Sequence, residues 1–162
     1  MPNHVTNRIT LGARNWTSVV GLCFRNNQLD FASLIPEPPQ MYLGDLSSDD
    51  AKDFKCNWQA WRIENWGTKW NAYKSSYRLY EDQLLIFFDT AWSVPYPFIA
   101  AFANTFKVAF EHAYFDEGGN FWGVESWVFE DDKSYRTKVR KSLDADYAKL
   151  RANLKGDSDA KI

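Results

Sequence analysis

The sequence predicts an α+β fold in which helices pack on one face of an antiparallel sheet. Segments whose apolar residues alternate or run continuously, as in strands, are interleaved with segments whose apolar residues recur at helical spacing. The chain of 162 residues, with 45% hydrophobic and 25% charged content, has the size and composition of a single globular domain. Aromatic residues make up 17% of the chain and include eight tryptophans, so we expect an aromatic-rich core.

A strand and a short helix are expected first. Residues 5–11 alternate and are rich in β-branched side chains, which indicates a strand that ends at Gly12. Thr17 is a suitable N-cap for a short helix, which stops where two asparagines follow one another at residues 26–27. Residues 29–35 are an extended candidate, and the proline-rich stretch after them ends it.

A second helix is expected before the middle of the chain. Ser47 or Ser48 is expected to cap it. Its apolar side chains then share one stripe, formed by Ala51, Phe54, Trp58 and Trp61.

The second half of the chain predicts three strands and one helix. Residues 83–92 are apolar on both faces until Asp89, which is typical of a central strand covered on at least one side. Pro97 is well placed in the first turn of a helix that carries several phenylalanines. Residues 108–115 and 121–129 read as a hairpin joined by a glycine-containing turn.

The expected order is strand, helix, strand, insertion, strand, helix, strand, strand. Two helices around an antiparallel sheet in this order are compatible with the split βαβ arrangement called ferredoxin-like. The name describes topology alone, because two cysteines 33 positions apart do not suggest an iron–sulfur cluster. We therefore expect residues 1–131 to form one ferredoxin-like domain.

A basic amphipathic helix is expected over residues 132–155, followed by a disordered tail at residues 156–162. Charge is unevenly distributed, because residues 1–132 carry 10 basic against 17 acidic side chains, whereas residues 133–162 carry 9 against 4. The apolar stripe of the expected helix has spacings of four, four, four, three and four residues, and it consists of Tyr135, Val139, Leu143, Tyr147, Leu150 and Leu154.

This basic segment allows three interpretations. Its side chains could neutralise phosphates of a nucleic acid, although the acidic body of the chain would repel the same phosphates. It could dock on an acidic protein, with charge attraction speeding the association. It could also pack its apolar stripe on its own domain and leave the basic face in solvent. The candidate contacts of the basic helix are Arg136, Lys138, Arg140 and Lys141.

A tryptophan-rich loop is the most distinctive local feature of the sequence. Two carboxamides, a lysine and two indoles lie within seven residues, and they offer hydrogen-bonding groups, a point charge and stacking faces. That mixture would suit a nucleotide or a peptide. A structural corner would instead use the tryptophans to plug the sheet edge and the asparagines to satisfy loop backbone. The candidate ligand or partner site comprises Asn65, Trp66, Lys69, Trp70, Asn71 and Trp92.

The sequence offers no constellation typical of catalysis or metal binding. His4, Cys23, Cys56 and His112 lack the short ligand spacings of zinc sites. His112 alternates with apolar residues of the expected strand, so we expect it to point inward with its hydrogen bonds satisfied. The cysteines fall on apolar helix faces with no neighbouring base. We therefore expect no enzyme, no cofactor and no metal.

Several segments together resemble the YubB-type ferredoxin-like proteins of phages and plasmids, a family of unknown function. The block at residues 65–71 is the most specific of them, and the order and spacing agree over residues 3 to about 125. The resemblance implies a ferredoxin-like fold and an origin in a mobile element, and it implies no catalytic residues. The matching segments are Asn3–Ile9, Leu34–Pro38, Glu64–Tyr73, Thr90–Pro97 and Phe121–Gly123.

These observations favour a non-catalytic accessory protein of a phage or plasmid that binds a host protein or protein complex, with inhibition of a bacterial defence system as its role. A nucleic-acid-binding module that uses the basic helix is one alternative, and a small-ligand or nucleotide binder that uses the tryptophan-rich loop is the other. A polar N-terminus and the absence of an apolar run of about 18 residues argue against secretion and membrane insertion, so we expect the bacterial cytoplasm.

Overall fold

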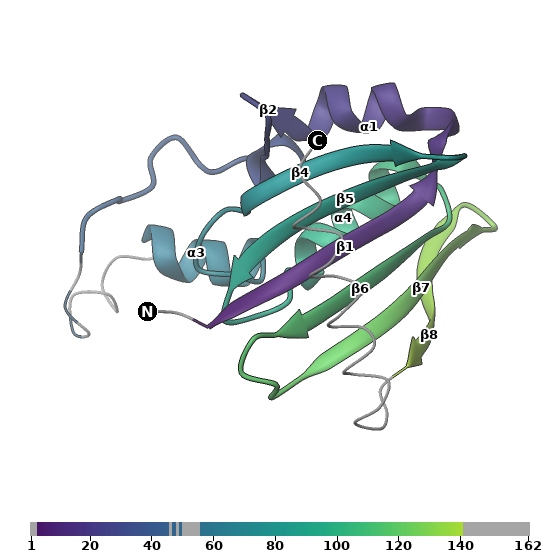
Figure 1. The fold of residues 1–162 in the computed structure, drawn as a ribbon. Coiled ribbons are helices and arrows are strands. Elements are labelled where there is room, and N and C mark those ends of the chain that lie inside the picture. Colours follow the sequence, from purple (N-terminus) through teal and green to yellow (C-terminus); the bar gives the residue numbers. More distant parts are fainter. Residues whose placement is uncertain (1–2, 46, 48, 50–55, 141–162) are drawn as a thin grey trace.

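The structure is a computed structural model, and it describes residues 3–45, 47, 49 and 56–140. One antiparallel sheet of six strands has the order β4-β5-β1-β6-β7-β8 (Figure 1). Its strands are β1 (His4–Gly12), β4 (Tyr73–Tyr80), β5 (Gln83–Ala91), β6 (Phe110–Asp116), β7 (Trp122–Glu130) and β8 (Lys133–Arg140). The helices are α1 (Trp16–Cys23), α3 (Trp58–Asn65) and α4 (Tyr96–Phe106), with 3₁₀ turns η1 (Ala13–Asn15) and η2 (Phe31–Ser33).

The topology of the first four sheet strands is ferredoxin-like. Strand β1 lies between β5 and β6, and β4 lies outside β5. The connection from β1 to β4 contains α1 and α3, and the connection from β5 to β6 is α4, which gives the split βαβ arrangement. The predicted α+β class and ferredoxin-like architecture are therefore confirmed. Strands β7 and β8 extend the sheet beyond β6.

The core lies between the helices and one face of the sheet, which we call the inner face. Strand β1 buries every second side chain, among them Asn7, Ile9 and Leu11. Ile9 lies opposite Ile86 of β5 and His112 of β6, so these side chains share the inner face. The predicted aromatic-rich core is present, with buried rings from Phe31, Trp66, Phe88, Phe98, Phe102 and Phe110.

The expected C-terminal helix is wrong over residues 133–140, which form β8. Asp131 and Asp132 have φ values of 51° and 57°, the left-handed pair that a two-residue type I′ hairpin requires. Glu130 pairs with Lys133 across this turn. The chain therefore returns antiparallel to β7 after this turn. The sequence analysis had expected a helix to start at residue 132, within the turn.

The apolar spacing in this segment explains the error. A spacing of four is an even number, so it places two residues on one side of a strand as well as on one side of a helix. The sequence pattern from Tyr135 to Leu143 therefore could not decide between them. The remainder of the expected helix, residues 141–155, and the expected tail, residues 156–162, lie outside the described residues.

The expected extended segment at residues 29–35 is also largely wrong. A small hairpin of β2 (Phe24–Arg25) and β3 (Gln28–Leu29) surrounds the two asparagines, and both have left-handed φ values. The chain then turns into η2, because the Asp30 carboxylate accepts a hydrogen bond from the Ala32 amide and stabilises the turn.

The helices on either side of this hairpin begin at different residues than expected. Helix α1 starts at Trp16, one residue before the expected Thr17 cap. Helix α3 starts at Trp58, where the Asn57 side chain accepts from the Ala60 amide at 2.8 Å. Ser47 does not cap α3, and Ser48 lies outside the described residues, as do Ala51 and Phe54. Strand β4 was not predicted, because its residues are mostly polar, as suits a strand at the edge of a sheet.

Candidate functional site

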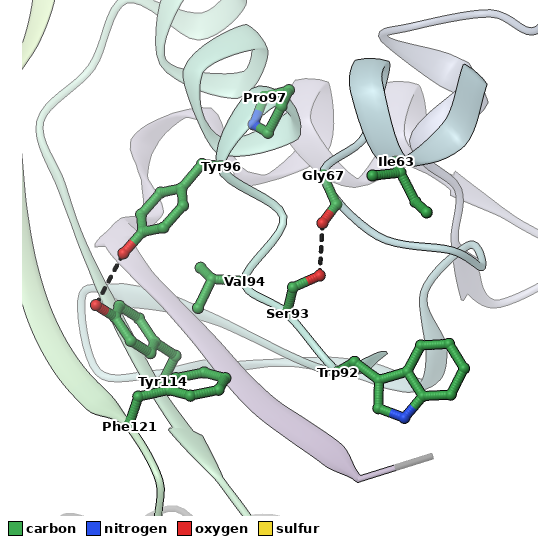
Figure 2. Close-up of a pocket in the computed structure, with 9 residues that line it drawn as sticks. All are labelled: Ile63, Gly67, Trp92, Ser93, Val94, Tyr96, Pro97, Tyr114 and Phe121. Carbon is green, nitrogen blue, oxygen red and sulfur yellow. Dashed lines mark hydrogen bonds between the residues drawn. The ribbon is translucent and has the colours of Figure 1, made fainter. Parts of the chain in front are cut away.

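A pocket of about 540 Å³ opens where the end of β5, the end of α3 and the start of α4 meet (Figure 2). Ile63 and Trp92 lie on one side of it, and Tyr96, Tyr114 and Phe121 lie on the other. The lining is mainly apolar and aromatic, which is the usual character of small-molecule and anchor-residue pockets. The remaining lining residues are Gly67, Ser93, Val94 and Pro97.

Trp92 is presented to solvent by a strained backbone. Its φ is 65°, a left-handed conformation that is rare for a bulky side chain, and its side chain is 50% exposed. The conformation is held by the Trp92 amide, which donates to the Asn3 carbonyl at 3.0 Å, and by the Thr90 hydroxyl, which donates to the Ser93 carbonyl at 2.8 Å. Strained residues of this kind cost roughly 1–3 kcal/mol and cluster at functional sites.

Gly67 allows the loop after α3 to approach the start of α4. Its φ is +83°, and an added Cβ would lie 2.7 Å from the Pro97 ring. Its carbonyl accepts a hydrogen bond from the Ser93 hydroxyl at 2.6 Å (Figure 2). The two loops that frame the pocket are therefore tied directly to each other.

Three of the predicted site residues are used inside the fold. Trp66 is 1% exposed, and its indole N–H donates to the Ile35 carbonyl at 2.9 Å. The Asn65 amide donates to the Trp61 carbonyl, which lies one turn earlier in α3. The Asn71 side chain accepts from the Phe31 amide at 2.9 Å and donates to Asp30 at 2.7 Å. For these three residues the structural-corner interpretation holds.

The other three predicted residues gather at the surface beside the pocket. The Lys69 ammonium lies 5.3 Å from the Trp92 ring centroid and 5.8 Å from that of Trp70. Trp58 of α3 forms a third side, at 5.6 Å. The Trp70 and Trp92 rings are themselves 6.1 Å apart, centroid to centroid. Cation–π attraction thus holds the two exposed indoles together next to the pocket mouth.

A polar cluster that the sequence analysis did not identify lies behind the pocket. One carboxylate oxygen of Glu125, a residue that is completely buried, accepts from the Tyr96 hydroxyl at 2.9 Å and from Arg136 at 3.0 Å. The Tyr114 hydroxyl lies 2.9 Å from that of Tyr96 and 3.4 Å from the same oxygen. Gly123 leaves the space that the Tyr114 phenol occupies, since an added Cβ there would meet it at 2.5 Å.

His112 completes this cluster on the inner face, where the sequence placed it, but the expectation that its hydrogen bonds are satisfied is wrong, because Nδ1 has no hydrogen-bond partner among the described residues. The Asn7 amide group donates to the Val5 carbonyl and to Thr90, which orients the Asn7 side-chain oxygen as an acceptor. His112 Nε2, at 3.0 Å from that oxygen, must therefore carry a proton. In the neutral ring Nδ1 is then a bare acceptor, 3.8 Å from the second carboxylate oxygen of Glu125.

Burial sets the protonation of this pair. It lowers the pKa of His112 below the ordinary 6.5, and the attraction of Glu125 opposes burial without outweighing it. Burial also raises the pKa of Glu125, but the His112 ring in its protonated form, the Tyr96 hydroxyl and the Arg136 charge together lower it below the ordinary 4.5. The pKa of Tyr96 is raised, mainly by burial, so its hydroxyl stays neutral and acts as a hydrogen-bond donor.

We expect acid to destabilise the protein through this cluster. Unfolding releases His112 to bind a proton below pH 6.5 and Glu125 to bind one near pH 4.5, so the unfolded state takes up more protons. The free energy of unfolding should therefore fall as pH decreases below about 6.5, by up to about 1.4 kcal/mol per pH unit for one proton. Urea unfolding at a series of pH values measures the slope, and His112→Gln should make it shallower. A His112 ring that titrates at or above 6.5 by NMR would contradict this assignment.

The predicted basic contacts do not form one helical face. Arg136 turns toward Glu125, and its guanidinium lies 5.4 Å from the Tyr96 ring centroid. Lys138 and Arg140 belong to β8, and Lys141 lies outside the described residues. Of the four, Arg136 joins the polar cluster behind the pocket.

The cysteines and histidines do not come together. Cys23 is buried at the end of α1, and burial raises the pKa of its thiol to about 12, which leaves it a poor nucleophile. His4 lies on β1, where its ring nitrogen Nδ1 is 2.6 Å from the Tyr73 hydroxyl. Within the described residues, no three side chains of His, Cys, Asp or Glu are grouped as metal ligands would be. None of the described helices is long and apolar enough to span a membrane.

The fold and the comparison with known families agree on the class of protein, a ferredoxin-like α+β domain. A family model described as "Ferredoxin-like domain in Api92-like protein" matches residues 65–137, which run from the last residue of α3 into β8. This match includes most of β8. The sequence analysis had expected a helix in that segment and had placed it outside the region of family resemblance. No curated protein and no solved structure gives a significant match.

Proposed function

We propose that the protein is a non-catalytic binding protein that recognises another protein through the surface around the pocket. We call this the aromatic surface and define it by Ile63, Trp70, Trp92 and Tyr96. The proposal rests on the position of these four large apolar side chains, which are 50%, 36%, 50% and 37% exposed, around the mouth of the pocket. Ile63, Trp92 and Tyr96 line the pocket, and the Trp70 ring lies beside that of Trp92. Exposed apolar patches beside a pocket mark interaction sites, and tryptophan and tyrosine dominate the energetics of protein interfaces.

The strain at Trp92 supports this assignment. A left-handed backbone that carries a half-exposed indole costs stability and contributes little burial in return. Such a feature is understandable if the indole is buried on binding. The pocket beside it can then take an apolar or aromatic side chain of the partner, as anchor pockets in interfaces do.

The resemblance to phage and plasmid proteins supports a host protein in the bacterial cytoplasm as the partner. We extend the proposal to inhibition of a bacterial defence system, because an accessory protein of a mobile element gains from blocking one. The phenol hydroxyls of Tyr96 and Tyr114 are tied to Glu125, and burial raises the pKa of both, so they are not activated, which fits a binding role better than catalysis.

We expect Trp92→Gly to weaken partner binding strongly while leaving the domain folded. Glycine adopts left-handed φ values without strain, so the free energy of unfolding should change by no more than about 1 kcal/mol. Loss of a central interface tryptophan should weaken binding by about 2 kcal/mol or more, roughly 30-fold. Affinity capture from nuclease-treated bacterial lysate, followed by a binding titration with the captured protein, measures the effect.

The matched control is Tyr80→Ala. Tyr80 is 60% exposed and lies at the end of β4, so it tests the loss of an exposed aromatic side chain outside the aromatic surface. Capture should survive this change and should be lost in Trp92→Gly and in Trp70→Ala. Equal capture by all the variants, or capture of nucleic acid alone, would contradict the proposal. For the defence role, expression of the wild type should restore plating of a phage that the host restricts, and Trp92→Gly should not.

A small ligand is the second candidate, favoured by the pocket volume of about 540 Å³, which lies in the usual range for small-molecule sites. A nucleotide or aromatic metabolite that bound there would quench tryptophan fluorescence. Trp70→Ala should remove that quenching if the ligand stacks on the aromatic surface. Quenching without any captured protein would favour this candidate over the first.

A further inference from the structure

Lys69 is held beside the pocket by three indoles that come from different segments of the chain. Trp58 belongs to α3, Trp70 to the loop before β4, and Trp92 to the turn after β5. The Lys69 ammonium lies 5.6 Å, 5.8 Å and 5.3 Å from their respective ring centroids. Cation–π contacts with three segments restrict a long side chain that would otherwise sample many rotamers, so the ammonium has a defined place next to the pocket.

The polar side-chain groups at this place are hydrogen-bond donors. Within the described residues, Lys69 has cation–π contacts but neither an ion pair nor a hydrogen-bond acceptor. The indole N–H groups of Trp70 and Trp92 meet no acceptor in that part of the chain either. An ammonium offers three donors and an indole offers one, and neither group accepts a hydrogen bond. The complementary ligand group is therefore an acceptor that carries negative charge.

The hydroxyls that line the pocket are already paired inside the protein. The Ser93 hydroxyl donates to the Gly67 carbonyl at 2.6 Å, and the hydroxyls of Tyr96 and Tyr114 are paired with each other and with Glu125. The pocket therefore suits an apolar group. Trp92 both lines the pocket and contacts Lys69, so a group in the pocket and a group bound to the ammonium lie about one indole ring apart.

We propose that this site binds a segment of the partner protein in which an aspartate or glutamate side chain stands next to a large apolar side chain. The apolar side chain fills the pocket as an anchor, and the carboxylate accepts hydrogen bonds from the Lys69 ammonium. Such charge-assisted hydrogen bonds are stronger than those between neutral groups. The inference rests on the proposed function, because it states the kind of partner that the aromatic surface recognises.

The charge of the chain favours a protein with a local acidic group over a nucleic acid. Residues 1–132 carry 10 basic against 17 acidic side chains. A nucleic acid would bring phosphates along its whole length toward this negative excess. A single carboxylate in contact with Lys69 is attracted directly, whereas charges more than about 8 Å away are largely screened at physiological salt.

The proposal is tested on the full-length chain with three dipeptides that are acetylated and amidated at their ends. Phenylalanine is followed by glutamate in the acidic dipeptide, by glutamine in the neutral one and by lysine in the basic one. The NMR signals of the indole N–H groups of Trp70 and Trp92 report binding. We expect a dissociation constant on the order of 1 mM for the acidic dipeptide, about fivefold tighter than for the neutral one. Equal affinity for these two, or no saturable binding of the acidic one up to about 10 mM, would overturn the proposal.

Substitutions of Lys69 assign the preference to its charge. Lys69→Met should remove the advantage of the acidic dipeptide and leave the affinity for the neutral one unchanged, whereas Lys69→Arg should keep the advantage. The matched control is Lys133→Met, which removes the same charge from the start of β8, at the opposite end of β7 from Phe121, and should keep the advantage. If Lys69→Met weakened both dipeptides equally, Lys69 would only position the indoles, and the proposal would be wrong.

The remaining outcomes separate this inference from its competitor and from the proposed function. Tightest binding of the basic dipeptide would mean that the indoles take a cation of the ligand in place of Lys69, and it would overturn the proposal. Loss of partner capture in Trp92→Gly together with equal binding of all three dipeptides would keep the aromatic surface as the binding site and contradict the carboxylate preference. Preferential binding of the acidic dipeptide without any captured protein would support the carboxylate preference and contradict the proposed function.

Discussion

Replacing Trp66 with alanine is expected to lower the free energy of unfolding by about 3–5 kcal/mol, the range for loss of a large buried aromatic side chain. The indole is 1% exposed, and its ring centroid lies 5.9 Å from that of Phe31 and 5.7 Å from that of Trp61, both edge to face. The substitution would leave a cavity where α3 joins the core and would leave the Ile35 carbonyl without its indole donor. Urea or thermal unfolding measures the loss.

Two comparisons separate the contributions to this loss. Trp66→Phe keeps an aromatic ring but removes the indole N–H, so it should cost less than the alanine substitution while still losing the hydrogen bond to Ile35. Trp70→Ala removes a similar side chain that is 36% exposed, and it should change stability by no more than about 1 kcal/mol. If Trp70→Ala proved as destabilising as Trp66→Ala, the division of the motif into a buried and an exposed tryptophan would be wrong.

That division could not be predicted from the sequence. Trp66 and Trp70 belong to the same short motif, and the composition of that motif is typical of a binding loop. Their different roles depend on where α3 ends, because the Trp66 amide still donates to the Arg62 carbonyl while Gly67 turns the chain away with a φ of +83°. The composition of the loop does not distinguish the two indoles, and the end of α3 decides that Trp66 faces the core while Trp70 is exposed.

The ferredoxin-like topology was predictable because β1, α4, β6 and β7 have clear apolar periodicity and β5 is a continuous apolar run. The prediction from apolar spacing failed where a strand and a helix would show the same spacing. A spacing of four from Tyr135 to Leu143 fits both a strand and a helix, and the turn at Asp131–Asp132 decided for β8. The Asp131–Asp132 pair was the signal for this strand, because two consecutive aspartates are compatible with a two-residue hairpin turn.

The polar cluster behind the pocket was missed for a related reason. Glu125 stands in a strand between Gly123 and Trp127, and alternation puts all three on the face of His112, which had been expected to point inward. A carboxylate on a buried face needs donors, so this position was a detectable signal. Its partners were not detectable, because Arg136 meets Glu125 only if residues 133–140 return as a strand beside β7.

Replacing Glu125 with leucine is expected to lower the free energy of unfolding by about 3 kcal/mol, because removal of one member of a buried charged network leaves the others without partners. Arg136 would lose its carboxylate, and the hydroxyls of Tyr96 and Tyr114 would lose the acceptor that they share. Leucine matches glutamate approximately in volume, so the loss reports the polar network more than packing. Equilibrium unfolding in urea at neutral pH measures it.

The control for this substitution is Glu125→Gln, whose side chain can still accept from Tyr96 and can donate to His112 Nδ1, the atom that otherwise faces a carboxylate oxygen. It should therefore cost clearly less than leucine, even though it removes the charge opposite Arg136. The same comparison connects the cluster to the pocket, since Tyr96 both lines the pocket and donates to Glu125. If leucine and glutamine were equally costly, the charge pair with Arg136 would dominate the network. If neither changed stability, the cluster would have no structural role, and its position behind the pocket would instead point to a role in binding.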